Sequence, residues 1–153
     1  AGLERLIAAE REAQIEPAAL RRFSALLPPH PIVAVKMAAR LKLSNKARKR
    51  LACAVERQLD SNPQALAYRI GTECAVDRLL VAGEPARAAS AIHWRIPSLP
   101  LGGGTLISRG VPEGPIVART LRNIEDNWVD AGFPTGEAFE RIVTDALATA
   151  SKS

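Results

Sequence analysis

The side chains best suited to chemistry in this sequence are cations concentrated in one short stretch. Positions 36 to 57 hold eight lysines and arginines and a single acid, Glu56. This window carries a charge of +7 against +5 for the whole chain, so the remainder is slightly acidic. Such a basic patch is typical of proteins that contact nucleic-acid phosphates, and a merely solvated basic helix is the alternative. The eight cations are Lys36, Arg40, Lys42, Lys46, Arg48, Lys49, Arg50 and Arg57.

Patterns that would support catalysis are missing from the sequence. Phosphoryl transfer assisted by two metal ions needs closely spaced carboxylates, and the chain has no Asp-x-Asp pair. The glycines at 102–104 are not followed by the Lys-Ser or Lys-Thr of a Walker phosphate-binding loop. No Ser-His-Asp arrangement involves His30 or His93, and no close ligand pair suggests a metal site. We therefore expect no catalytic residue and no bound metal in this chain.

The cysteine count and the hydropathy of the chain bear on the cellular compartment in which it is expected. A small secreted fold would carry more than two cysteines, so we expect Cys53 and Cys74 to be free thiols in a reducing compartment. No run of about 18 apolar residues and no signal-peptide layout occurs, so we expect no membrane contact and a cytoplasmic location. The chain opens directly on an amphipathic helix and its only methionine is Met37. We therefore expect it to be a segment of a longer polypeptide.

Apolar periodicity predicts an all-α fold without a significant sheet. Alanine and leucine dominate the apolar residues, and both favour helices. We expect a helical body of several short helices over 1–95 and a small helical tail unit over 96–153, the latter with a connector, a turn rich in glycine and proline, and two helices. The expected helices cover about 3–13, 17–27, 32–41, 44–59, 63–71, 73–82, 85–92, 105–109, 115–131 and a last segment ending near 150.

The helix that would position the cations begins at Ser44, which has the residue type of an N-cap. Its apolar stripe is predicted to run from Ala47 to Leu59, which leaves the basic side chains on the outward faces. The candidate phosphate contacts are Lys42, Lys46, Lys49 and Arg50. Asn45, near the helix start, would either position a backbone oxygen of the ligand or cap the helix.

A second candidate site lies at the start of the helix that opens with Gly114 and Pro115. Free amides at a helix N-terminus attract phosphate. Gly110 and Gly114 would allow the backbone to approach a ligand closely, and Arg109 and Arg119 would add positive charge. The alternative is a turn needed only for folding, with glycines chosen for positive φ. Trp128 is expected in the core, and Trp94 either in the core or stacked on a base.

The segment LGGGTLISRG at 101–110, followed by VPEGPIVARTL at 111–121, resembles the tail of bacterial CCA-adding tRNA nucleotidyltransferases and related poly(A) polymerases. That tail has a glycine, usually Asp-Leu, a second glycine, and a Gly-Pro that opens a helix. Trp128 with Gly132 and Phe133 continues the resemblance, and residues 21–27 and 39–51 are similar to the body of the same family. Thr105 stands where the family usually has Asp, and Ala118 where a second glycine is common.

The resemblance implies that body and tail hold the outer arms of a tRNA, or another structured RNA, through phosphate and 2′-OH contacts. A catalytic head absent from this chain would extend the RNA 3′ end, with Mg and CTP or ATP bound by the head and neck. The parent polypeptide would then be a nucleotidyltransferase, and the chain itself would hold no cofactor and be inactive. Two alternatives remain open, a helical protein-interaction scaffold and a helix-turn-helix DNA-binding module around 41–55.

Overall fold

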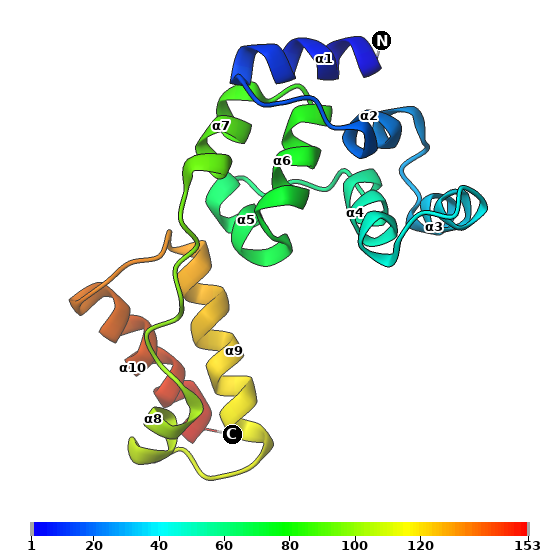
Figure 1. The fold of residues 1–153 in the computed structure, drawn as a ribbon. Coiled ribbons are helices and arrows are strands. Elements are labelled where there is room, and N and C mark those ends of the chain that lie inside the picture. Colours follow the sequence, from blue (N-terminus) through cyan, green and yellow to red (C-terminus); the bar gives the residue numbers. More distant parts are fainter. Residues whose placement is uncertain (1, 153) are drawn as a thin grey trace. The chain divides into compact units, whose positions relative to one another are not determined.

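A computed structural model describes residues 2–152, and within that range it contains ten α-helices and no strand (Figure 1). The expected all-α fold is confirmed. The chain divides into two compact units, Ala1–Ile96 and Pro97–Ser153. No helix in the described part of the chain combines the length and the hydropathy of a membrane-spanning segment.

The first unit contains seven helices, and three of them begin with proline. Proline suits the first helical position because its missing N–H has no intrahelical partner there. In the structure Pro31, Pro63 and Pro85 each hold that position. The helices are α1 (Gly2–Ala13), α2 (Ala19–Leu26), α3 (Pro31–Arg40), α4 (Asn45–Val55), α5 (Pro63–Ile70), α6 (Thr72–Val81) and α7 (Pro85–His93).

Two expected helix boundaries in this unit are wrong. The second helix begins at Ala19 rather than at Pro17, because Ala18 has extended backbone, with φ −130° and ψ 123°. The fourth helix ends at Val55, because Arg57 has a φ of +59° that an α-helix cannot continue through. Leu59 therefore lies beyond the helix that was expected to bury it, and it is 37% exposed.

Two apolar clusters hold the first unit together. The larger one joins α1, α5, α6 and α7, with Trp94 packed against its edge. The smaller one lies between α3 and α4, where Ala34 and Ala38 meet Leu51 and Val55. Phe23 of α2 and Leu27, which directly follows α2, pack against it. The smaller cluster fixes which face of α4 is buried, and so it decides which cations on that helix reach solvent.

The second unit consists of α8 (Gly103–Ser108), α9 (Pro115–Asp130) and α10 (Glu137–Ser151). The short α8 begins two residues earlier than expected. Trp128 is 2% exposed, and its indole Nε1 donates to the carbonyl oxygen of Pro134 at 2.9 Å. The expected core position of Trp128 is confirmed, and its ring also meets Phe133 and Phe139 edge to face.

Candidate nucleic-acid interface

The start of α4 is capped by a side chain. Ser44 has extended backbone, and its Oγ accepts a hydrogen bond from the amide of Ala47 at 3.1 Å. The predicted N-cap is therefore confirmed, and Asn45 is the first helical residue rather than the cap. The Asn45 side chain is exposed, so a contact between Asn45 and a ligand stays a prediction.

Five cations around this helix start are exposed to solvent. Among residues 2–152, none of the five has an ion-pair partner. Two lie on the last turns of α3, one lies in the connecting turn with a φ of +54°, and two lie on the first turns of α4. We call this group the α3–α4 cationic surface; its members are Lys36, Arg40, Lys42, Lys46 and Lys49.

Arg50 does not project outward as expected, and this correction changes its role. Its Nε donates to Asp77 Oδ2 at 2.8 Å, and one terminal nitrogen donates to Asp77 Oδ1 at 3.0 Å. The other terminal nitrogen lies 3.2 Å from Glu73 Oε2, and the side chain is only 20% exposed. The hydrogen bond to Asp77 raises the pKa of Arg50 above its ordinary value. Arg50 therefore joins α4 to α6 instead of facing a ligand.

Asp77 belongs to a buried network of ion pairs that sequence reasoning missed. Its carboxylate is fully buried and also accepts a hydrogen bond from Arg21 Nε at 2.8 Å. Arg21 in turn donates to Glu10, which is 1% exposed and also accepts two bonds from Arg22. The network links α1, α2, α4 and α6. The one available signal was an aspartate inside the apolar run from 74 to 82, since buried acids require partners.

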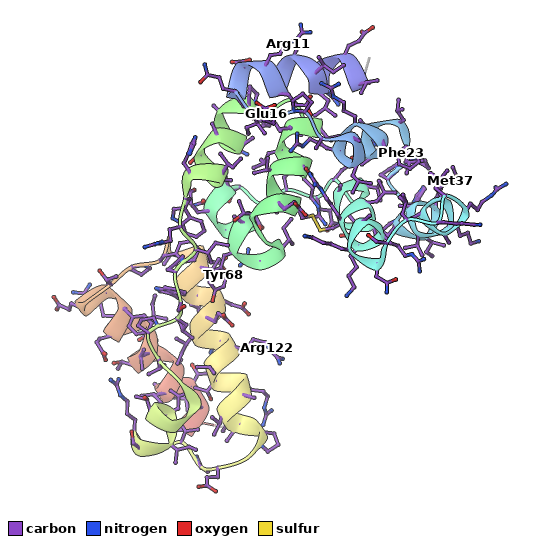
Figure 2. The ribbon with its side chains drawn as sticks, in the orientation of Figure 1. Arg11, Glu16, Phe23, Met37, Tyr68 and Arg122 are labelled. Atoms are coloured by element: carbon purple, nitrogen blue, oxygen red, sulfur yellow. A yellow bond between two sulfur atoms is a disulfide. The ribbon has the colours of Figure 1, made fainter. Side chains whose placement is uncertain are left out.

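A disulfide between Cys53 and Cys74 also joins α4 to α6 (Figure 2). The expectation of two free thiols is therefore wrong. The cysteines are 21 positions apart, but packing of the two helices brings their Cα atoms to 6.1 Å. Arg78 of α6 reinforces the same junction by donating from Nε to the Cys53 carbonyl oxygen at 2.8 Å.

A cleft of about 420 Å³ opens beside this junction. Lys46 and Lys49 of α4 contribute to its lining, as does the start of α6. The first amide of α6 to bond within the helix is that of Ala75, which donates to Gly71 O, so the amides before it are left for other partners. The cleft therefore has a positive side suited to an anion. Its lining comprises Lys46, Lys49, Arg50, Cys53, Ile70, Gly71, Thr72, Glu73 and Cys74.

Of the candidate phosphate contacts in the second unit, Arg109 is less available to a ligand than expected. Arg109 donates through both terminal nitrogens to the Glu140 carboxylate, at 2.9 and 3.3 Å. This contact raises the pKa of Arg109 and lowers that of Glu140. Gly110 and Gly114 are exposed and have φ of +100° and +126°, with open space where a Cβ would lie. The turn conformation therefore requires these glycines, whatever they contact. Arg119 is exposed on α9.

The fold and this surface define a coarse class, an all-helical protein with one concentrated cationic face. No protein-family model matches the chain, and no curated protein matches it either. Any finer statement of function depends on the chemistry of the surface and on the resemblance in the sequence.

Proposed function

We propose that this chain binds structured RNA, as the tRNA-binding body and tail region of a tRNA nucleotidyltransferase of the CCA-adding or poly(A) polymerase type. It would position the tRNA so that a catalytic head, which this sequence does not contain, adds nucleotides to the 3′ end. The observation that carries the proposal is the α3–α4 cationic surface, five exposed cations that no acid in residues 2–152 neutralises. The resemblance at 101–121 supplies the choice of RNA. A cytoplasmic location, where tRNA, CTP and ATP are present, is part of the proposal.

The chemistry of this surface suits a sugar-phosphate backbone more than it suits base reading. Four of its five members are lysines, whose ammonium groups act as point charges without the planar geometry that selects a base edge. Double-stranded RNA is recognised mainly by shape, through phosphates and 2′-hydroxyls. If the chain neutralises about four to six phosphates, the logarithm of affinity plotted against the logarithm of salt concentration should have a slope of about −3 to −5.

The start of α9 would provide a second, smaller contact to the same RNA. Arg119 is exposed there, and Gly114 leads into a helix start that carries no side-chain cap. Arg109 would reach a phosphate only by exchanging its bond to Glu140, so we expect it to contribute less than Lys46 or Lys49. Gly110 would act by shaping the turn.

The test is fluorescence anisotropy with a tRNA and with a DNA duplex of equal length, across a salt series. A variant carrying Lys42→Glu, Lys46→Glu and Lys49→Glu should lose about 100-fold in tRNA affinity, and its salt slope should become shallower by about 3. A control carrying Arg11→Glu, Arg141→Glu and Lys152→Glu makes the same change in net charge at exposed positions elsewhere. If both variants bind tRNA equally well, the proposed surface is wrong.

One observation favours a second candidate function, DNA binding by a helix-turn-helix. A four-residue turn joins α3 to α4, the two helices share an apolar cluster, and the first turn of α4 is exposed and basic. Recognition helices of this class present their first residues to the major groove. The same anisotropy series separates the two, because tighter and sequence-dependent binding to the DNA duplex would favour this candidate. Salt-insensitive binding to a protein would instead favour an interaction scaffold.

A further inference from the structure

We propose that Cys53 and Cys74 form a reversible thiol–disulfide exchange site whose co-reactant is a small anionic thiol. The disulfide joins α4 to α6 and lines the cleft of about 420 Å³ that also contains Lys46 and Lys49. This inference goes beyond the proposed RNA binding and does not depend on it.

Both cysteines line the cleft, and Cys53 is the more exposed of the two. Cys74 is 7% exposed, whereas Cys53 is half-buried on the side of α4 that faces the cleft. An incoming thiolate would therefore attack the Sγ of Cys53, and the Sγ of Cys74 would be the leaving atom. This direction of attack is favourable, because Cys74 is the third residue of α6 and a helix start stabilises a thiolate.

The charges around the cleft select the co-reactant. Lys46 and Lys49 are exposed, and no acid in the described residues pairs with them. The one acid in the cleft lining is Glu73, which lies 3.2 Å from Arg50. An anionic thiol such as glutathione is therefore attracted, and a cationic thiol such as cysteamine is repelled. Arg78, whose terminal nitrogen lies 3.5 Å from Cys53 Sγ, is itself paired with Glu56 at 3.0 Å, so the unpaired positive charge at the cleft comes from Lys46 and Lys49.

The junction is built so that the disulfide can form again after reduction. The bonds from Arg50 to Asp77 and from Arg78 to the Cys53 carbonyl hold α4 against α6 without the sulfur atoms. Leu51 of α4 and Leu79 of α6 are fully buried, each in an apolar cluster that does not include the two cysteines. The two thiols therefore remain close together in the reduced protein.

The exchange proceeds in two balanced steps. The thiolate of one glutathione bonds to Cys53 Sγ as the sulfur–sulfur bond breaks, and Cys74 leaves as a thiolate that takes up a proton. A second glutathione thiolate attacks the glutathione sulfur of this mixed disulfide and releases Cys53, which is protonated in turn. The two electrons that reduce the protein come from two glutathione molecules, which leave as glutathione disulfide.

The experiment measures free thiols by alkylation and mass spectrometry while circular dichroism reports the helical fold. The oxidised protein should gain two thiols in reduced glutathione without losing helicity, and oxidised glutathione should remove both. With Lys46→Gln and Lys49→Gln together, reduction by glutathione should slow by about threefold and reduction by cysteamine should not slow. A control with Arg11→Gln and Lys152→Gln should be reduced at the same rate as the original protein, both by glutathione and by cysteamine.

Two results would overturn the proposal. In the first, the disulfide survives excess glutathione until the helices unfold, which would make it a purely structural bond. In the second, the lysine substitutions change the rates with glutathione and cysteamine by the same factor, which would show that charge in the cleft does not select the thiol.

Discussion

Arg21 of α2 and Asp77 of α6 are 56 positions apart in the sequence, yet the Nε of one donates to the Oδ1 of the other at 2.8 Å in the interior of the first unit. Arg50 of α4 binds the same carboxylate, and its Nε lies 2.8 Å from Asp77 Oδ2. Asp77 is therefore the point at which three helices are tied together electrostatically. Each guanidinium depends on that single carboxylate for part of its neutralisation.

Replacing Asp77 with asparagine should strongly destabilise the protein. The substitution leaves the guanidinium groups of Arg21 and Arg50 without their shared anion, and breaking a buried ion pair from one side costs about 3–5 kcal/mol. Urea unfolding followed by circular dichroism measures the change. Glu137→Gln removes the exposed partner of Arg141 and should leave the unfolding midpoint almost unchanged. A stable Asp77→Asn protein would show that the network contributes little.

Removing the disulfide should lower the free energy of unfolding of the oxidised protein. The bond closes a loop between positions 21 apart, and a loop of that size corresponds to about 3 kcal/mol in the unfolded-chain entropy account. A variant with Cys53→Ser and Cys74→Ser should therefore unfold at lower urea concentration than the oxidised protein. The reduced original protein is the matched comparison, and it should unfold close to the double variant. Equal stability of all three would contradict the expectation.

Ser44→Ala should weaken the start of α4. The lost bond from the Ala47 amide to Ser44 Oγ corresponds to about 1 kcal/mol for a typical N-cap. Because Lys46 and Lys49 lie on the first two turns, loosening of those turns should also reduce tRNA affinity in the anisotropy assay. Ser61→Ala, at an exposed position outside any helix, is the control for stability. Identical amide hydrogen exchange at the start of α4 in both variants would contradict the capping role.

Glu140 should titrate below its ordinary pKa of 4.5, because Arg109 hydrogen-bonds to its carboxylate. A carboxyl group whose pKa is lower in the folded state than in the unfolded state stabilises the folded state above about pH 4.5. This contribution disappears as the pH falls through the folded-state pKa. Carbon-detected NMR of the Glu140 side chain measures the titration. Arg109→Gln should return it to the ordinary value, whereas Arg141→Gln should not. If the titration midpoint of Glu140 is the same in the Arg109→Gln variant as in the original protein, the two side chains do not pair in solution.

Local features of the sequence predicted most of the helices, because the signals for them act over a few residues. Ser44 was predicted as an N-cap from its residue type alone, and Pro63, Pro85 and Pro115 mark helix starts for the same local reason. Expected boundaries were wrong where the backbone departs from its usual preference, as at Arg57 with its positive φ. In that conformation Arg57 donates hydrogen bonds to the carbonyl oxygens of Ser24 and Leu27, and no local pattern indicates these contacts.

By itself, the sequence determined that the chain is helical and that positive charge is concentrated between positions 36 and 57, since periodicity and charge can be counted along the chain. Which of those cations are available to a ligand depends on how the helices pack. Arg50 and Lys49 are neighbours of the same charge, yet the 100° turn between them in an α-helix directs Arg50 to Asp77 and Lys49 to solvent. The pairing of Cys53 with Cys74 was decided in the same way, because it depends on which helices pack together.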